Sequence, residues 1–255
     1  MRMMTTSVSL DEQILAIDVG ATNTKFCHVD PDGTLLETVR RQRTNYPCTP
    51  DRLVDVLVTR IERSASSRVG VGFPGELCDG LVTNPANLAR PGGITTEIDL
   101  QLDRAWRGFE LQEALRIATG RDVRVVNDAT LAAFGCCTGS GTELVLTLGT
   151  GMGLACEIDG QLQDVRCVGF ESFLDARTYD QALGERSRAE DEARWRTWLG
   201  LAVVGLALEF GATTVHLAGG NAKRLALNTF ADLAGPVVIH GNDASLHGGA
   251  KLFYN

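Results

Sequence analysis

The segment from Leu15 to Lys25 constrains the fold of this chain more than any other. It reads Leu-Ala-Ile-Asp-Val-Gly-Ala-Thr-Asn-Thr-Lys, so a short apolar strand delivers Asp18 and then turns at Gly20 into small residues and hydroxyls. Small residues let backbone N–H groups approach a polyanion without steric obstruction. The segment therefore predicts a phosphate-binding turn. Its candidate residues are Asp18, Gly20, Thr22, Asn23, Thr24 and Lys25.

Asp18 is the candidate metal ligand, because a carboxylate at a strand end can hold Mg2+ directly or through water. The alternative is that an Asp before a Gly only stabilises the turn. That alternative would have to explain Thr22, Thr24 and Lys25 separately.

A second segment of similar design follows at Leu146-Thr-Leu-Gly-Thr-Gly-Met-Gly153. Its candidate phosphate contacts are Thr147, Gly149, Thr150 and Gly151. Taken alone, it would also fit an ordinary glycine-rich hairpin. Further along, Gly219, Gly220 and Asn221 lie between an expected strand and an expected helix, where glycines let a nucleoside or phosphate approach a helix start. A tight strand-to-helix turn is the alternative there. Two phosphate-type turns predict two similar domains that close on one nucleotide.

Asp128 is the candidate general base for phosphoryl transfer to an alcohol. It follows the apolar residues 123–126, at the carboxyl end of a strand, where open α/β sheets place their ligands. Asn127 beside it can orient a hydroxyl. The alternative is that Asp128 only caps the helix that opens at Ala129.

The segments Phe73-Pro-Gly75 and Asn84-Pro-Ala-Asn87 predict a polar rim for a polyhydroxylated substrate. Asn87 is the candidate sugar contact, because an amide side chain both donates and accepts hydrogen bonds. An ordinary loop asparagine is an equally good interpretation.

Local patterns predict a mixed α/β chain. Strands are expected at residues 14–18, 25–29, 34–38, 68–73, 123–126, 143–148, 154–158, 215–218 and 237–240. Helices are expected at residues 51–64, 109–119, 129–134, 193–210 and 244–253, with another beginning at Ala222. The apolar positions of the 193–210 helix would pack internally or across a homodimer.

Composition narrows the class of function. A net charge of −8 over 255 residues argues against a nucleic-acid or membrane partner, and no apolar run reaches the roughly 20 residues that span a bilayer. Residues 1–12 lack a signal-type apolar core, which favours a cytoplasmic protein. The seven cysteines have no repeating spacing and the four histidines lie far from any cysteine cluster, so neither a disulfide framework nor a zinc site is expected.

Together these segments resemble the sugar kinases of the repressor, open reading frame and kinase (ROK) family, which belongs to the fold group of actin and hexokinase. The matching pieces occur in the family's order: Ile17–Lys25, Gly70–Gly75, Val126–Ala129, Leu146–Gly153 and Leu217–Asn221. The short length and the second glycine segment are most similar to the polyphosphate/ATP glucokinase branch.

The resemblance implies an α/β, ribonuclease H-like fold of two domains, residues 1–120 and 121–255, with a ligand cleft between them and the closing helix 244–255 packed back on the first. It implies a hexose kinase that uses Mg2+ and either ATP or polyphosphate. Asp128 would accept the proton of the sugar hydroxyl, while Asn127, Asn87 and Gly75 would line the sugar. Gly219 to Asn221 would lie against the nucleoside.

One departure from the family pattern leaves the function open. Family members carry a Glu-x-Gly-His segment whose Glu and His hold the sugar, whereas here Asp164–Phe173 has no His, and Glu171 is its remaining candidate. A catalytically reduced sugar- or nucleotide-binding regulator is therefore the alternative. The zinc motif of larger members is also missing, and the few residues before the first strand are too short for a DNA-reading module.

Overall fold

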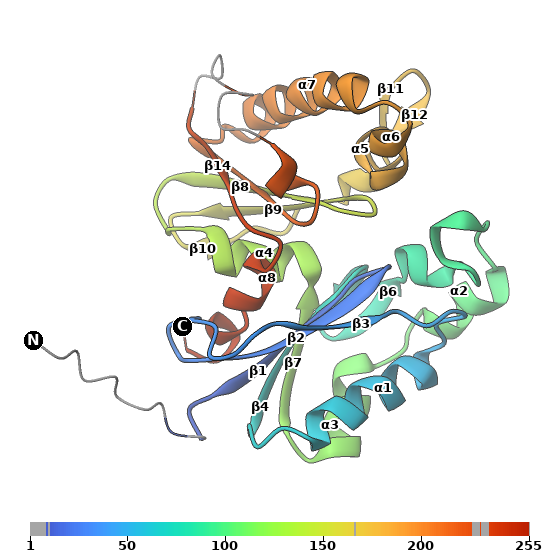
Figure 1. The fold of residues 1–255 in the computed structure, drawn as a ribbon, viewed down its shortest axis with the longest axis vertical. Coiled ribbons are helices and arrows are strands. Elements are labelled where there is room, and N and C mark those ends of the chain that lie inside the picture. Colours follow the sequence, from blue (N-terminus) through green and yellow to red (C-terminus); the bar gives the residue numbers. More distant parts are fainter. Residues whose placement is uncertain (1–8, 10, 166, 226–229, 231–234, 255) are drawn as a thin grey trace, which may run out of the picture. The chain divides into compact units, whose positions relative to one another are not determined.

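The computed structural model describes residues 9, 11–165, 167–225, 230 and 235–254. It divides the chain into two units, Met1–Val126 with Gly249–Asn255 and Asn127–Gly248. The boundary expected from the sequence was after residue 120, with a longer segment, 244–255, packed back on the first domain. Each unit is built on its own five-stranded mixed sheet (Figure 1).

The sheet of unit 1 has the order β3-β2-β1-β4-β7. Its strands are β1 (Ile14–Val19), β2 (Asn23–Val29), β3 (Arg40–Arg43), β4 (Arg68–Phe73) and β7 (Asp122–Asn127). β1 pairs antiparallel with β2 and parallel with β4, and all of its residues are buried. Two helices, α1 (Pro50–Glu62) and α3 (Leu111–Thr119), contact each other and lie beside this sheet (Figure 1). Leu53, Leu57 and Ile61 of α1 and Leu111 and Leu115 of α3 are buried in its core.

The third strand is not where the sequence predicted it. Residues 34–38 make a single bridge, between Val29 and Leu35, and the ladder with β2 is formed instead by Arg40–Arg43. Glu37 leaves the path of the strand, because its side chain and backbone bind β2 instead. Its carboxylate lies 2.6 Å from His28 Nδ1, and its carbonyl accepts from the Cys27 thiol. The chain therefore rejoins the sheet beside the first half of β2.

Shorter elements complete unit 1. They are β5 (Glu76–Cys78), β6 (Leu81–Asn84), the 3-10 turns η1 (Ala86–Ala89) and η2 (Gly93–Thr95), and α2 (Leu100–Trp106). Asp99 caps α2 by accepting from the N–H groups of Gln101 and Leu102. Trp106 at its end is fully buried and donates to the carbonyl of Cys48.

Unit 2 carries a sheet of order β10-β9-β8-β13-β14. Its strands are β8 (Thr142–Leu148), β9 (Met152–Ile158), β10 (Gln161–Leu162), β13 (Thr214–Ala218) and β14 (Val237–Ile239). The central strand β8 pairs antiparallel with β9 and parallel with β13, as β1 does with β2 and β4. In both units the glycine turn therefore joins a central strand to its antiparallel neighbour.

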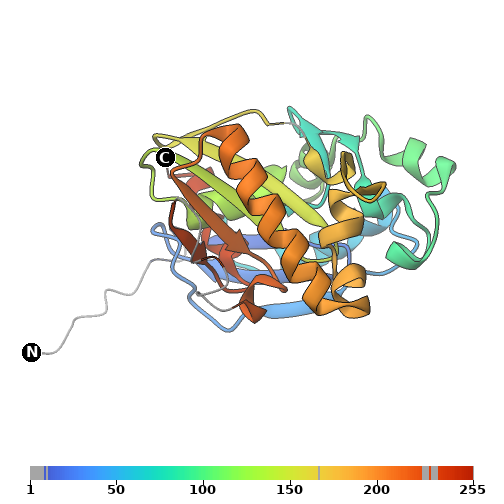
Figure 2. The same cartoon turned by 90° about the horizontal axis from the view of Figure 1, so that it is seen from above.

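Helices cover both faces of the unit 2 sheet. α7 (Glu192–Phe210) runs diagonally across one face (Figure 2) and ends at Gly211, whose φ is 63°. α4 (Asp128–Cys136) and α8 (Ala244–His247) pack together on the other face. The remaining elements of this unit are η3 (Val168–Phe170), β11 (Ser172–Leu174), β12 (Arg177–Thr178), α5 (Tyr179–Leu183), α6 (Glu185–Glu190) and η4 (Ala222–Arg224).

α7 buries one side and exposes the other. Trp195, Leu199 and Leu206 are fully buried, whereas Leu201 and Leu208 are 53% and 75% exposed. The internal packing that the sequence predicted is present, and a homodimer through the exposed side stays a prediction. Among the described residues, no helix is both long and apolar enough to span a membrane.

Two expected helices are shorter than the sequence suggested. The helix expected from Ala222 is the three-residue turn η4, and residues 226–229, which would continue it, lie outside the described residues. The closing helix is divided into α8 and a 3-10 turn, η6 (Ala250–Leu252), by Gly248 and Gly249. At Gly248 a Cβ would lie 1.9 Å from the carbonyl oxygen of Leu131, so α4 leaves no room for a side chain there.

Candidate functional site

In unit 1, Asp18 and Lys25 form an ion pair beside the first glycine turn. They are directly paired on β1 and β2, and Lys25 Nζ lies 2.8 Å from Asp18 Oδ2. Both side chains are only 12–13% exposed. Lys25, predicted as a phosphate contact, is therefore held by the candidate metal ligand and provides a fixed positive charge beside it.

The backbone carbonyls of the first glycine turn are bound from within unit 1. Gly20 O accepts from Thr44 Oγ1 at 2.6 Å, Ala21 O from Tyr46 Oη at 2.8 Å and Thr22 O from the Thr44 N–H at 3.0 Å. Burial raises the pKa of Tyr46 to about 12, so its hydroxyl stays a donor. Because these three carbonyl oxygens are hydrogen-bonded within the protein, they repel an anion bound at the turn less strongly.

Gly20 is required by the tightness of this turn. Its N–H donates to Asn23 O at 3.1 Å, and a Cβ on Gly20 would lie 2.7 Å from the same oxygen. Thr24 is buried, whereas Thr22 and Asn23 are exposed on the turn. This turn was predicted from the sequence, but Thr44 and Tyr46, which bind it from about two dozen residues away, were not.

The second glycine turn, in unit 2, is bound in the same manner. The carbonyl of Gly149 accepts from the Glu185 N–H at 2.9 Å and from Asn221 Nδ2 at 3.1 Å. The Gly149 N–H closes the turn onto Gly151 O, and Thr147 Oγ1 accepts from the Gly153 N–H. Thr147 and Asn221, both predicted as ligand contacts, thus shape the turn itself.

Asp180, which was not predicted from the sequence, also fixes this turn. Its Oδ1 accepts from the Met152 N–H at 2.7 Å, and a Cβ on Gly151 would lie 2.5 Å from the same oxygen. A Cβ on Gly184 would lie 2.4 Å from Thr150 O. The start of α5 and the start of α6 are therefore pressed against the turn, with glycine at each point of closest approach.

The Gly219–Asn221 segment packs on the second glycine turn. Gly219 has a φ of +93°, and a Cβ there would lie 2.5 Å from Leu148 O, which accepts from the Asn221 N–H at 3.0 Å. Asn221 is 5% exposed. Gly220 is more open, since its closest neighbour to a Cβ is Asn242 Oδ1 at 3.5 Å.

Asn127 and Asp128 divide two tasks at the start of α4. Asn127 is the N-cap, because its Oδ1 accepts from the N–H groups of Ala129 and Thr130 at 2.9 and 3.3 Å. Asp128, for which capping was the alternative, is the first helical residue, and its Oδ1 accepts from the Ala129 N–H at 2.8 Å. It is half-buried at a helix N-terminus, which stabilises an ionised carboxylate. A sugar contact by Asn127 would have to come from its Nδ2.

The predicted substrate residues lie in both units. In unit 1, a Cβ on Gly75 would lie 2.2 Å from Asn84 O, so glycine is required beside β6. Asn87 is half-buried in η1, which begins at Ala86 with a φ of 48°. In unit 2, Glu171 directly follows η3 and is half-buried, and its carbonyl accepts from the Tyr179 N–H.

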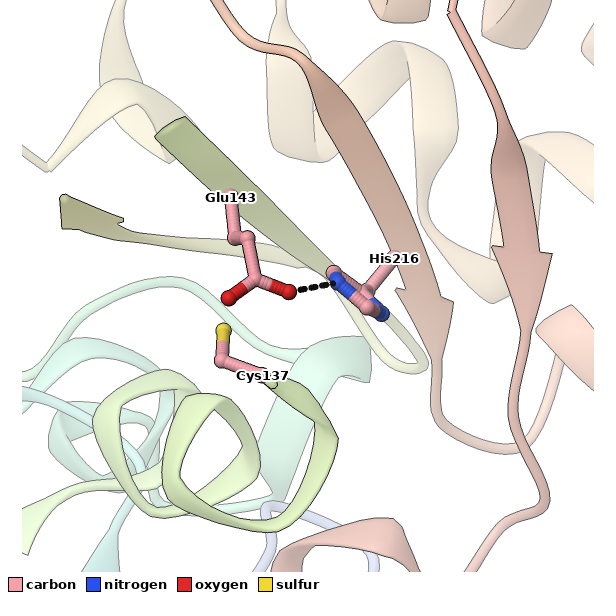
Figure 3. A group of neighbouring side chains, drawn as sticks. All are labelled: Cys137, Glu143 and His216. Atoms are coloured by element: carbon pink, nitrogen blue, oxygen red, sulfur yellow. Dashed lines mark hydrogen bonds and ion pairs between the residues drawn. The ribbon is translucent and has the colours of Figure 1, made fainter. Parts of the chain in front are cut away.

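Unit 2 also contains a buried polar cluster that the sequence did not reveal. Glu143 and His216, on the adjacent strands β8 and β13, are 1% and 2% exposed, and His216 Nε2 lies 3.0 Å from Glu143 Oε1 (Figure 3). Cys137, at the end of α4, points its thiol toward the carboxylate. His216 Nδ1 lies 2.8 Å from His240 Nε2. Burial, followed by the charges of His216 and His247, lowers the pKa of His240.

The ligand atoms of Cys137, Glu143 and His216 lie within 4.8 Å of one another and are of types that bind transition metals. The carboxylate is already fully engaged, however. It accepts from the N–H groups of Thr138, Gly139 and Ser140, from Thr138 Oγ1 and from His216, so each oxygen has three contacts. Burial alone would raise the pKa of Glu143, but the Thr138 N–H, His216 and the Gly139 N–H lower it to about 2. We interpret the cluster as a buried anion satisfied by hydrogen bonds.

Comparison with known proteins settles the family. The ROK family model matches residues 14–166, which is more than half of the chain. The chain belongs to the ROK family. The family predicted from the ordered motifs is thereby confirmed.

Relatives of known structure show the same fold. An inorganic polyphosphate/ATP-glucomannokinase from Arthrobacter sp. strain KM is 25% identical, with a TM-score of 0.78 over 95% of this chain and 98% of that one. A ROK glucokinase from Streptomyces griseus, solved with glucose and AMPPNP, has a TM-score of 0.71 over 94% and 98% at 18% identity, which supports the fold alone. The predicted actin/hexokinase-like fold class is confirmed.

Curated relatives cover less of the chain. The glucokinase of Streptomyces coelicolor is 29% identical over 148 residues, which are 54% of this chain and 41% of that protein. The chain therefore matches less than half the length of this curated relative. The chain is therefore similar to sugar kinases, but this similarity does not identify its sugar substrate or its phosphoryl donor.

Proposed function

We propose that this protein is a glucokinase-like hexose kinase that transfers a phosphoryl group from ATP or polyphosphate to a sugar hydroxyl. One structural observation carries the proposal. In both glycine turns the carbonyl oxygens are bound by the protein itself, at Gly20, Ala21 and Thr22 in unit 1 and at Leu148 and Gly149 in unit 2. Turns whose carbonyl oxygens are engaged in this way suit phosphate groups, because fewer acceptor oxygens then oppose an anion.

Asp128 is the proposed base that accepts the proton of the attacking sugar hydroxyl. Its carboxylate lies at the first residue of α4, held at Oδ1 by the Ala129 N–H. Positioning of the hydroxyl and neutralisation of phosphate charge would supply most of the acceleration. Asn87, Gly75, Glu171 and the Nδ2 group of Asn127 are the proposed sugar contacts.

Mg2+ is the proposed metal, and Asp18 its proposed protein ligand. Mg2+ prefers oxygen ligands and keeps several waters, so one or two carboxylates and the donor phosphates are enough to hold it. Asp18 fits this requirement through water, since its Oδ2 is already bound to Lys25. When bound, the metal would neutralise charge on the donor phosphates.

A donor-by-acceptor screen tests the proposal. The protein is incubated with ATP or polyphosphate and a panel of hexoses, N-acetylated sugars and polyols, and products are detected by mass. Asp128→Asn should lower kcat by about 100-fold or more while donor affinity is retained. Asp122→Asn, an exposed residue on the preceding strand, is the matched control and should leave kcat unchanged. Equal turnover in the Asp128 variant would exclude it as the base.

The alternative function is a sugar- or nucleotide-binding regulator with reduced catalysis. It is favoured by the region 164–173, which lacks the histidine of the family's sugar clamp. Failure to phosphorylate any acceptor with either donor, combined with measurable sugar binding, would favour this alternative. A cytoplasmic location and a homodimer accompany both proposals as predictions.

A further inference from the structure

A row of charged side chains lies on one face of the unit 1 sheet, next to the first glycine turn. Strand register places Asp18 opposite Lys25, Lys25 opposite Arg41 and Asn23 opposite Arg43. Directly paired residues of antiparallel strands project from the same face. The opposite face of the same strands carries the core residues Ile17 and Phe26.

The charge of this row is opposite to that of the whole chain. Three cations, Lys25, Arg41 and Arg43, accompany a single carboxylate, Asp18, whereas the chain carries a net charge of −8. Lys25 is held against Asp18 at 2.8 Å, but Arg41 and Arg43 are exposed. Exposed cations therefore extend outward from the phosphate-type turn.

We propose that Arg41 and Arg43 form a subsite for the donor's phosphate chain, beyond the phosphates held by the first glycine turn. This inference rests on the proposed kinase function and adds donor-binding residues to it. Arginine suits the role because its planar group binds phosphate oxygens in pairs. Two residues apart on β3, the two arginines are about 7 Å apart along the strand, so they contact different phosphates of a linear chain.

The subsite predicts a preference for long donors. Inorganic polyphosphate can reach both arginines, whereas ATP ends in a nucleoside after three phosphates. Both donors share the phosphate chain that the arginines recognise, and comparing them with tripolyphosphate separates the contribution of chain length from that of the nucleoside.

Direct binding, measured without sugar, is the test. Titration calorimetry follows long-chain polyphosphate, tripolyphosphate and ATP at two salt concentrations, with wild type and the Arg41→Ala/Arg43→Ala variant. Loss of two charge-assisted contacts should weaken long-chain polyphosphate binding by about tenfold or more and make it less salt-sensitive. ATP affinity should change by less than about threefold.

Arg40→Ala is the matched control. Arg40 is on the same strand and is 71% exposed, but it is paired with Phe26, on the opposite face, and binds Glu37. Its removal should change polyphosphate affinity by less than about twofold. Circular dichroism melting checks that both variants are folded.

Two results would overturn the inference: wild-type protein that binds no polyphosphate, or equal polyphosphate affinity in wild type and the double variant. Neither depends on turnover, because no sugar is present. Absence of kinase activity would instead contradict the proposed function, while leaving the polyphosphate subsite measurable.

Discussion

Glu143→Gln should destabilise unit 2, although it exchanges only one carboxylate oxygen for an amide nitrogen. Gln has nearly the same shape as Glu but carries no charge, and its amide nitrogen replaces an acceptor with a donor. In the folded protein that nitrogen would face the N–H groups of Thr138, Gly139 and Ser140 or the ring of His216. A buried donor that faces other donors loses its hydrogen bonds and keeps its desolvation cost.

The pKa of Glu143 gives the magnitude. A pKa lowered from 4.5 to about 2 corresponds to about 3 kcal/mol of stability that the ionised carboxylate contributes at neutral pH. Because the folded-state pKa is lowered, this contribution is complete above pH 4.5 and is lost as pH falls through 2. By the same linkage relation roughly 1 kcal/mol remains at pH 3.

Urea unfolding at pH 7 and pH 3 measures the effect. Wild type should exceed Glu143→Gln by about 3 kcal/mol at pH 7, and the difference should narrow by roughly 2 kcal/mol at pH 3. Glu113→Gln, whose half-exposed carboxylate lies 3.7 Å from Arg116, is the control and should shift stability by less than about 0.5 kcal/mol. A Glu143 variant as stable as wild type at pH 7, or a difference that does not change with pH, would refute the buried-anion interpretation.

Substitutions at four further positions probe the two glycine turns. Tyr46→Phe removes the donor to Ala21 O and should cost about 1 kcal/mol in urea unfolding and raise the KM for the donor. Asp180→Leu should raise the donor KM more than Asp180→Asn, which keeps an acceptor for the Met152 N–H; equal KM values would exclude that contact as important. Gly219→Ala should lower stability by roughly 2 kcal/mol or more, measured as a fall in Tm, because the φ is positive and the Cβ meets Leu148 O. Asp18→Ala should weaken donor binding with Mg2+ more than without it, and equal calorimetric affinities in both conditions would contradict the proposed metal role.

Local sequence patterns predicted most strands and long helices of this fold. The apolar run before Asp18 corresponds to β1, and the helical spacing before Gly211 corresponds to α7. Both patterns could be recognised because burial of a strand or of one helix face requires apolar residues at regular positions close together in sequence. The prediction of a strand at 34–38 was wrong, because the contact between His28 and Glu37 turns the chain away from the ladder with β2. Such a contact joins residues through space and leaves no periodic signal.

The candidate site shows the same limit. Gly20 and Gly149 were recognisable because a glycine turn is a local motif, but the groups that bind their carbonyls come from distant positions. Thr44 follows β3, and Glu185 opens α6. Neither belongs to a motif of its own, so only the folded arrangement reveals them. The cluster around Glu143 was missed for a similar reason, since His216 reaches it from 73 residues along the chain.

The Asn127-Asp128 pair shows where structure adds to a motif. In sequence, either residue can cap the following helix, so a capping role for Asp128 competed with catalysis. The structure assigns the cap to Asn127, whose Oδ1 accepts from the N–H groups of both Ala129 and Thr130. A helix end that is already capped does not need the neighbouring carboxylate for that purpose, and this strengthens the case for testing Asp128 as the base. If Asp128→Asn unfolds α4 while Asn127→Ala does not, the division of tasks is wrong and the carboxylate is the structural group.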